Sequence, residues 1–236
     1  MKTKNSILFI LICATIFSCG SSSANVRREK RNVEVFTKIS SASGINVNFV
    51  QGNSHTLEIE TDAENLKKLE VSVERGTLTL KCKDGERFKR NSMVTVYVSA
   101  KKLEAIAMSG GSDFFSKKLD GNGQFSIAAS GGADVDIDDL NMDECRIALS
   151  GGADCEIKQL KAKILDLAAS GGSDASIHLK ESNTVSVATS GGADVILTGK
   201  TKSLSASSSG GSDLDLSGMT YETISSNKSG GGSIKK

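Results

Sequence analysis

The pentapeptide SGGAD at Ser150–Asp154 belongs to a series of closely similar copies in this chain. The copies begin at Ser109, Ser130, Ser150, Ser170, Ser190 and Ser209, and a degenerate copy, SGGGS, begins at Ser229, so the intervals are 21, 20, 20, 20, 19 and 20 residues. A propeller blade needs about 40–45 residues and a helical hairpin repeat about 33. A leucine-rich repeat has a similar length, but its L-x-x-L-x-L core is absent. The period therefore predicts a coil of short strands with one turn per repeat.

Apolar and polar residues alternate on both sides of each Gly-Gly pair. Counted from the serine as position 0, the apolar residues fall at −5, −3 and −1 and again at +3, +5 and +7. In the third copy these positions hold Cys145, Ile147, Leu149, Ala153, Cys155 and Ile157. A period of two is typical of strands with one buried face. Two adjacent glycines in every repeat and frequent β-branched residues disfavour a helix.

The length of the repeat fits a closed coil. Twenty residues at about 3.3 Å each give a perimeter of about 66 Å, enough for two or three flat sides. Strands joined in this way run parallel, and such crossovers are nearly always right-handed. We therefore predict an all-β chain folded as a single-stranded, right-handed parallel β-helix. Position +3, which is Ala or Ser in the first six copies, predicts a tight corner.

The N-terminus has the features of an export signal. Lys2 and Lys4 precede the apolar run ILFILICATIF at 7–17, which is too short to span a membrane as a helix. The run ends in IFSCG, which resembles the lipobox of bacterial lipoproteins, although Phe17 stands where a small residue is usual. Residues 1–18 are thus expected to be a lipoprotein signal peptide and Cys19 the lipidated residue. The alternative is an ordinary signal peptide cut near Ser18 or Ser21.

The rest of the chain divides by the regularity of its pattern. Residues 19–32 are expected to be the lipidated cysteine and a flexible, basic tether. Residues 33–236 are expected to form the β-helix, with irregular turns over 33–108 and regular SGG repeats over 109–236. In the irregular part we expect the same coil to continue, with one helical turn at 63–70 and a hairpin-like corner at 74–76.

The repeat corners are the candidate site. Glycine permits φ > 0 and close approach of stacked corners, so we interpret the pairs as architectural and expect Gly152, for example, to be essential. The corner glycines are Gly110, Gly111, Gly131, Gly132, Gly151, Gly152, Gly171, Gly172, Gly191, Gly192, Gly210 and Gly211. The serine at 0 and the aspartate at +4 are expected to bond the turn amides.

The aspartates at +4 should form one surface column. Its members are Asp113, Asp134, Asp154, Asp174, Asp194 and Asp213. At about 5 Å, neighbouring carboxylates repel by about 0.8 kcal/mol in water and about 3 kcal/mol at an effective dielectric constant of 20. Solvent can carry this repulsion, or divalent cations such as Ca²⁺ could relieve it. Binding of a metal by the column therefore stays an open alternative.

A family resemblance covers nearly all of the mature chain. The stretch SSASGINVNFVQG at 40–52, followed by NLKKLEVSVERGTLTLK and the SGG ladder, resembles the family described as "putative auto-transporter adhesin, head GIN domain". Gly44, Ile45 and Asn46 stand at the namesake triplet. The resemblance implies a single-stranded right-handed β-helix on exported, often lipid-anchored proteins of Bacteroidetes-type bacteria. It implies no catalytic residues.

The residues give little support to catalysis. His55 lies in the irregular segment, and His178, at +8 of one repeat, has no equivalents in neighbouring repeats. The carboxylates repeat regularly instead of gathering at one place. Cys145 and Cys155 fall on inward positions, and with Cys82 they leave an odd number of cysteines, which argues against a disulfide framework. No enzyme activity and no cofactor are expected, and a carbohydrate-active β-helix enzyme is the least favoured class.

The remaining classes are binding proteins and structural proteins. A net charge of +1 and the absence of a basic stripe with aromatics argue against nucleic acid. We predict a cell-envelope lipoprotein of the outer membrane, held by its lipid anchor, that binds a protein or glycan ligand through its repetitive surface. The alternative is a structural envelope protein that assembles with itself or with a partner chain. Few aromatics near the repeats (Phe114, Phe115 and Tyr221) weaken the case for glycan.

Overall fold

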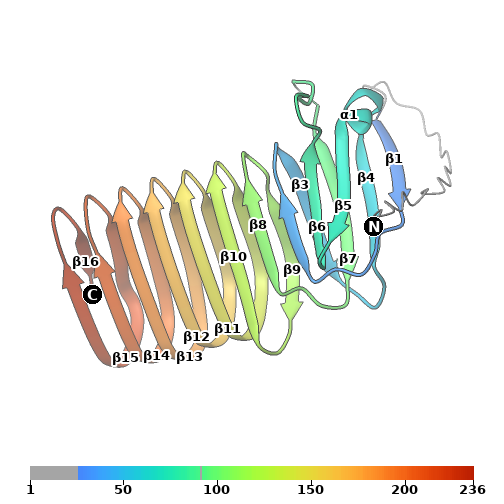
Figure 1. The fold of residues 1–236 in the computed structure, drawn as a ribbon. Coiled ribbons are helices and arrows are strands. Elements are labelled where there is room, and N and C mark those ends of the chain that lie inside the picture. Colours follow the sequence, from blue (N-terminus) through green and yellow to red (C-terminus); the bar gives the residue numbers. More distant parts are fainter. Residues whose placement is uncertain (1–25, 91) are drawn as a thin grey trace, which may run out of the picture.

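The computed structural model describes residues 26–90 and 92–236 as a stack of strands with one short helix, α1 (Ala63–Lys68) (Figure 1). The strands before the regular repeats are β1 (Val26–Arg31), β2 (Lys38–Ser41), β3 (Ile45–Gln51), β4 (Thr56–Asp62), β5 (Leu69–Glu74), β6 (Thr77–Cys82), β7 (Val94–Ala100) and β8 (Ala105–Ser109). Those that follow are β9 (Phe114–Asp120), β10 (Gln124–Gly131), β11 (Asp134–Gly151), β12 (Asp154–Gly171), β13 (Asp174–Gly191), β14 (Asp194–Ser208), β15 (Asp213–Lys228) and β16 (Ser233–Lys235).

The repeat of the sequence is the repeat of the structure. From β11 onward each long strand follows one coil, and each pairs in parallel with the strand one coil before and one coil after it. Equivalent residues face one another: Asp134 pairs with Asp154, Asp154 with Asp174, and Asp174 with Asp194. The predicted parallel β-solenoid with coils of about 20 residues is therefore confirmed.

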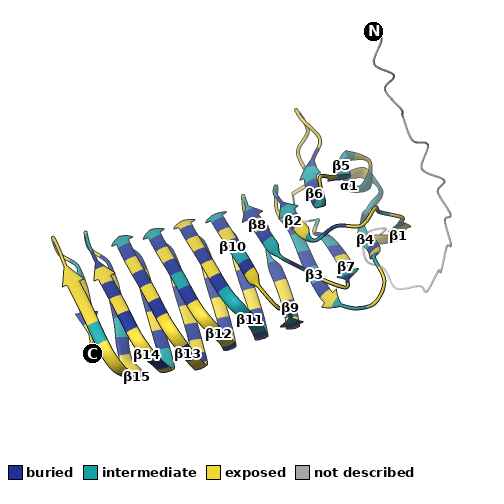
Figure 2. Cartoon of the chain, turned by 60° about the horizontal axis from the view of Figure 1, so that its bottom comes forward, coloured by how far each residue is buried: buried dark blue, intermediate teal, exposed yellow. Residues whose placement is uncertain are grey.

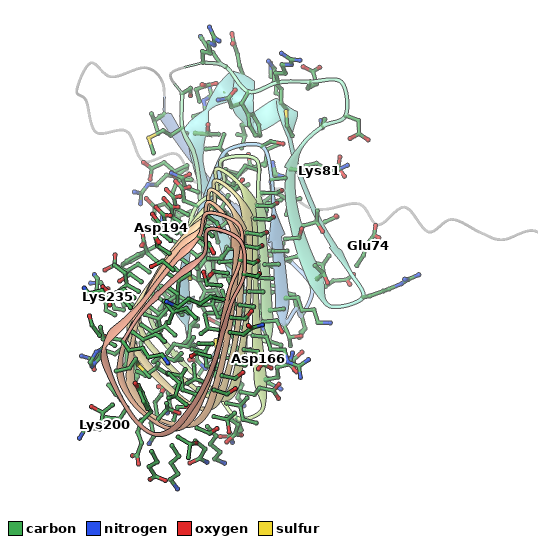
Figure 3. The ribbon with its side chains drawn as sticks, turned by 90° about the vertical axis from the view of Figure 1, so that its left-hand side faces the viewer. Glu74, Lys81, Asp166, Asp194, Lys200 and Lys235 are labelled. Atoms are coloured by element: carbon green, nitrogen blue, oxygen red, sulfur yellow. The ribbon has the colours of Figure 1, made fainter. Side chains whose placement is uncertain are left out.

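The coil is flattened and has two broad faces, seen along the stack in Figure 3. We call the surface formed by β9 and by positions +4 to +7 of the later coils the acidic face. Asp194 lies on it. We call the surface formed by β8, β10 and positions −6 to 0 of the later coils the serine face, on which Asp166 lies. Lys200 marks the bend that joins the two faces at the end opposite to the glycine corners.

The core is the strip between the faces. The inward positions predicted from the alternation are buried, as the striped colouring of the strands in Figure 2 shows. Ile147 and Ile157 are 3% and 0% exposed, and the +3 residues Ala133, Ala153 and Ala193 are each 0% exposed. The small residues at +3 are thus enclosed in the core at each corner. Cys145 and Cys155 are buried free thiols, as expected from their inward positions, and Cys82 is a buried free thiol as well.

The N-terminal part differs from the expected continuous coil. β2, β3, β6, β7 and β8 pair in parallel with neighbours of the stack, but β4 runs antiparallel to β1 and β7, and β5 runs antiparallel to β6. The β5–β6 connection is the expected corner, with Arg75 and Gly76 at φ of 50° and 73°. A two-residue connection can join only antiparallel strands, because a parallel pair needs a long crossover. This part is consequently a cap on the end of the stack.

The prediction of a flexible tether over residues 19–32 is wrong for its last residues. Residues 26–31 form β1, which pairs along its whole length with β4, from Val26 opposite Asp62 to Arg31 opposite Leu57. The basic strand meets an acidic one: Arg28 contacts Glu58 and Glu60 at 3.5 and 2.6 Å. The signal peptide expected at 1–18, Cys19 and the remainder of the tether lie outside the described residues.

The opposite end of the stack closes with polar residues. In the last coil the inward positions −3 and −1 hold Ser226 and Lys228, and both are exposed. Polar residues on the outer side of a terminal repeat keep a solenoid soluble, and lysine on an edge strand discourages pairing with another chain. Within residues 26–90 and 92–236, no helix is long and apolar enough to cross a membrane.

Candidate functional site

The two glycines of each corner have different roles. The first glycine has a left-handed backbone, with φ of 78° at Gly131, 73° at Gly151 and 80° at Gly171. A Cβ added to Gly151 would lie 3.0 Å from the backbone nitrogen of Gly131, and one added to Gly171 would lie 2.8 Å from the carbonyl oxygen of Gly151. Close contact between stacked corners therefore excludes a side chain at the first position.

The second glycine is less restricted, which corrects the expectation for Gly152. A Cβ added there would lie 3.4 Å from the carbonyl oxygen of Gly131, and one added to Gly132 would meet nothing within 4 Å. Positive φ at the second position occurs only at Gly111 among the six SGG[SA]D corners. The second glycine instead donates its N–H to the preceding coil, at 2.7 Å from Gly152 N to Gly131 O. Any residue except proline can donate this bond.

Alanine substitutions should separate the two roles. Gly151→Ala is expected to lower the free energy of unfolding by about 2 kcal/mol or more, because it combines left-handed strain with a clash against Gly131. Gly152→Ala should change it by no more than about 0.5 kcal/mol, as an exposed substitution without strain does. Urea denaturation followed by circular dichroism measures both. Equal losses in the two variants would contradict this assignment.

With the exception of Asp113, the corner serines and aspartates do not make the predicted bonds to turn amides. Ser170 and Ser209 donate their hydroxyls to carbonyl oxygens of the preceding coil, to Leu149 at 3.3 Å and to Thr189 at 3.4 Å. At +3, the Ser112 hydroxyl accepts from the N–H of Ile45 at 3.1 Å. No side-chain hydrogen bond is found for the +4 aspartates from the second to the sixth copy, all of which are described. Asp113, in the first copy, differs because its carboxyl accepts a hydrogen bond from the backbone of Asp134. From Asp134 to Asp213 the column therefore contributes nothing to the turns through its side chains.

The aspartates do form the predicted column. Consecutive +4 residues are direct partners from Asp134 to Asp213. Partial burial, and next the charge of Asp134, raise the pKa of Asp113. Within 26–90 and 92–236 no group of three His, Cys, Asp or Glu side chains could hold a metal ion. The structure therefore offers no support for the metal alternative.

The next acidic row, at position +6, contains two carboxylates with opposite pKa shifts. Desolvation, followed by the charges of Glu156 and Asp134, raises the pKa of Asp136. Asp215 lies in the same row near the end of the stack. Hydrogen bonds from Ser217 and Lys235 lower the pKa of Asp215 to about 2. Ionisation of the carboxyl group is thus disfavoured at Asp136 and favoured at Asp215, at opposite ends of the row.

This contrast predicts opposite effects of neutralisation on the melting temperature. A raised pKa means that folded Asp136 binds its proton more tightly than the unfolded chain does, so stability falls as the pH rises through the raised value. Asp136→Asn should therefore raise the melting temperature at neutral pH, and the gain should vanish once acid protonates Asp136. Asp215→Asn should lower it at neutral pH, and that loss should vanish as the pH falls from the ordinary Asp range towards about 2. Thermal melts over this range test both signs, and equal signs would contradict the assignment.

A shallow groove of about 550 Å³ crosses successive coils on the serine face. We call it the solenoid groove. Two rows of small outward side chains line most of it. The row at −2 is Ala107, Ala128, Ala148, Ala168 and Ala188, and the row at 0 is Ser109, Ser130, Ser150, Ser170, Ser190 and Ser209. Sequence reasoning missed this surface, although the outward position −2 is alanine in five successive repeats.

A second groove, of about 400 Å³, lies on the outer face of the N-terminal cap. We call it the cap groove. Its lining comes from residues 30–32, 48, 50, 55–58 and 97–99, which belong to or adjoin β1, β3, β4 and β7. Tyr97 and Asn48, both in its lining, are cross-strand partners. The lining extends in sequence from residue 30 to residue 99, so no local pattern could have indicated the groove.

The two histidines lie apart from the corners. His55 borders the cap groove, where its ring meets Phe36 edge-on at 5.3 Å between centroids. At position +8, just beyond the acidic face, Nδ1 of His178 lies 2.9 Å from the Thr198 hydroxyl. Burial raises the pKa of the Cys155 thiol to about 12, so this thiol stays protonated at neutral pH.

These features define a parallel β-solenoid with one capped end and a repetitive lateral surface. The family model described as "Putative auto-transporter adhesin, head GIN domain" matches residues 35–158 and 145–235. The chain belongs to this family, as the resemblance in its sequence implied. No curated protein matches it in sequence.

Solved structures share the fold. A putative adhesin from Bacteroides fragilis is 21% identical, with a TM-score of 0.77, over 90% of this chain and 97% of that one. A putative adhesin from Parabacteroides distasonis is 17% identical, with a TM-score of 0.71, over 90% and 97%. A protein of the same species described as a putative lipid binding protein is 16% identical, with a TM-score of 0.53, over 90% and 96%. At these identities the likeness concerns the fold alone.

Proposed function

We propose that this protein is a non-enzymatic adhesin of the cell envelope that contacts a partner through the lateral surface of its solenoid. Membership in a family of putative adhesins supports the class of function. The observation that carries the proposal is the solenoid groove, in which the same two outward positions recur on coil after coil. A contact made by one coil can be repeated by the next, about 4.8 Å further along the stack.

The chemistry of the solenoid groove suits contact over an extended area. Its alanines offer methyl groups, and its serines offer hydroxyls that donate and accept hydrogen bonds. Alanine loses no rotamer freedom when it becomes buried, so a partner can cover this row at a small entropic cost. A strand backbone fixed in a parallel stack also keeps the rows in place before a partner arrives, which lowers the cost of binding.

Adhesion of cells that display the protein tests this proposal. Ala148→Arg with Ala168→Arg places two long side chains in the solenoid groove without disturbing the core, since both alanines are exposed. Adhesion should fall by about tenfold or more, as expected when a central contact is lost. Ser176→Arg is the matched control, because Ser176 is equally exposed but lies on the acidic face. Unchanged adhesion in the double variant would exclude the groove as the contact surface.

Attachment to the envelope is part of the same proposal. We infer that Cys19 carries the lipid and that the solenoid projects from the membrane. Val26, the first residue of β1, follows Cys19 by seven residues. Such a segment spans at most about 25 Å, so the capped end would stay near the membrane and the regular coils would extend away from it.

Cys19→Ala is expected to abolish labelling by acyl groups and to release a soluble form, because the anchor is lost. Metabolic labelling and fractionation measure these effects. Ser21→Ala should leave both labelling and anchoring unchanged. Membrane association of Cys19→Ala that persists in high salt would contradict lipidation at this residue.

End-to-end self-assembly receives less support from the last coil. A head-to-tail stack would bring Ser226 and Lys228 against the strands of another copy, at positions where every earlier coil has buried residues. Burial of an unpaired lysine opposes such a contact. The lateral surface is therefore the better candidate for contact with a partner.

A further inference from the structure

One row of outward side chains crosses the cap and continues onto the acidic face. Cross-strand partners connect Lys30 to Glu58, Glu58 to Tyr97, Tyr97 to Asn48 and Asn48 to Phe115. The strands that carry them are neighbours in the order β1, β4, β7, β3, β9 (Figure 1). Neighbouring strands lie about 4.8 Å apart, so Tyr97 and Phe115 are about 10 Å apart with Asn48 midway.

Among the aromatic residues that the structure describes, Tyr97 and Phe115 are the exposed ones. Phe36, Phe49, Phe114 and Phe125 are at most 2% exposed, whereas Tyr97 and Phe115 are 39% and 36% exposed. A scattered exposed aromatic needs no explanation, but two rings aligned in one row beside a groove are informative. Aromatic rings at the surface offer a large, rigid, flat contact area.

Contacts within the cap fix the orientation of Tyr97. The Arg28 guanidinium lies over its ring, 5.5 Å from the centroid, and the tyrosine hydroxyl donates to Glu60 at 3.3 Å. Arg28 is itself held by Glu60 at 2.6 Å. Burial and, next, the charge of Glu60 raise the pKa of Tyr97, so its hydroxyl remains protonated. The remaining surface of the ring lines the cap groove.

The cap groove supplies polar groups beside the rings. Its volume of about 400 Å³ is within the range of small-molecule sites. The Asn48 amide can donate and accept, and the lining also holds Lys30, Glu58 and Arg31, the last paired with Glu29 at 2.7 Å. A groove with the Tyr97 ring, an amide and charges of both signs suits a neutral polyhydroxylated ligand better than an anion. Tyr97, Asn48 and Phe115 lie on strands that are paired on both sides, so an extended peptide could not reach them by adding a strand.

We propose that this row binds a linear glycan with equatorial linkages. Sugar rings would stack on Tyr97 and on Phe115, whose separation is about the length of one disaccharide unit. The amide of Asn48 would bond hydroxyls of the sugar between them. The inference rests on the proposed adhesive function and names a ligand class and a site for it, separate from the solenoid groove.

Isothermal titration of the purified full-length protein tests the site, with cellotetraose, chitotetraose and mannotetraose as probes. At least one should bind with a Kd below about 1 mM. Tyr97→Ala and Phe115→Ala should each weaken that binding by about tenfold, and Asn48→Ala should weaken it by a smaller factor. Ile196→Ala is the matched control, because Ile196 is 50% exposed and continues the same row on β14 without an aromatic ring. Maltotetraose, whose axial linkages curve the chain, should bind at least about tenfold more weakly than the best probe.

The outcomes separate this inference from the adhesive function. The inference is overturned if none of the three equatorially linked probes binds, or if binding is unaffected by both Tyr97→Ala and Phe115→Ala. In that case, adhesion that is still lost in the Ala148→Arg/Ala168→Arg variant would leave the proposed function standing. Binding that depends on the two rings, with adhesion unaffected by all of these variants, would retain the glycan site and exclude the solenoid groove as the adhesive contact surface.

Discussion

Replacing Gly199 by alanine is expected to lower the free energy of unfolding by about 4 kcal/mol or more. A Cβ added to Gly199 would lie 1.8 Å from the carbonyl oxygen of Leu179 and 2.7 Å from its carbonyl carbon. Both are backbone atoms of the neighbouring coil, so no side-chain rotation can relieve the overlap. The residue also has a φ of 109°, which side chains rarely adopt.

The position of Gly199 has a reason in the repeat. The interval from Ser190 to Ser209 is 19 residues, one fewer than in the neighbouring repeats. β13 and β14 accommodate this deletion by a register shift between Leu179 and Ser182, next to the pair formed by Leu179 and Gly199. The shortened coil stays in register with its neighbours because glycine permits so close an approach.

Urea denaturation and hydrogen exchange can measure this effect. The variant should lose amide protection first in β14–β16, because in a solenoid each coil is stabilised mainly by its neighbours. Gly132→Ala is the matched control, since a Cβ there meets nothing within 4 Å, and its stability should stay within about 0.5 kcal/mol of wild type. Similar losses in the two variants would show that backbone crowding at Gly199 is not what limits the coil.

The regular half of the fold could be predicted because a strand repeats every two residues and a coil every 20 or so. Ile147 was assigned to the interior and Asp136 to the surface from alternation alone, and each lies where it was expected. The roles of the two corner glycines could not be distinguished in this way. Both are glycine in every copy, whereas only the first combines φ > 0 with a neighbour at about 3 Å in the regular coils.

The N-terminal cap was harder to predict because its pairings are not periodic. β1 was interpreted as a tether since VRREKR is strongly charged, and its pairing with β4 depends on Glu58 and Glu60, about 30 residues away in sequence. The row through Tyr97 and Phe115 likewise depends on β3 lying between β7 and β9. Such long-range order appears in the structure but leaves no local signal in the sequence.

Ile157→Asp is expected to be as damaging as Gly199→Ala, but for a different physical reason. Ile157 is 0% exposed and lies between its coil partners Ile137 and Ile177, which are 1% and 2% exposed. An aspartate at this position would place an unpaired carboxylate among aliphatic side chains, where desolvation has no compensating hydrogen bond. We expect a loss of about 4–5 kcal/mol or more at neutral pH, which is a large part of the stability of an ordinary domain.

Two further variants identify the buried charge as the cause. Burial raises the pKa of the new carboxyl in the folded state, so part of the loss should be recovered as the pH falls through that raised value. In Ile157→Asn the new side chain has nearly the same shape as aspartate but carries no charge. The loss of stability in this variant, measured against wild type at each pH, should therefore be almost independent of pH. Glu156→Ala, one residue away on the exposed side of the same strand, should change stability by no more than about 0.5 kcal/mol. Equal stability of Ile157→Asp and Glu156→Ala in urea melts would show that the division of each coil into an inner and an outer row is wrong. Equal destabilisation of Ile157→Asp at all pH values would show that the loss comes from packing and not from charge.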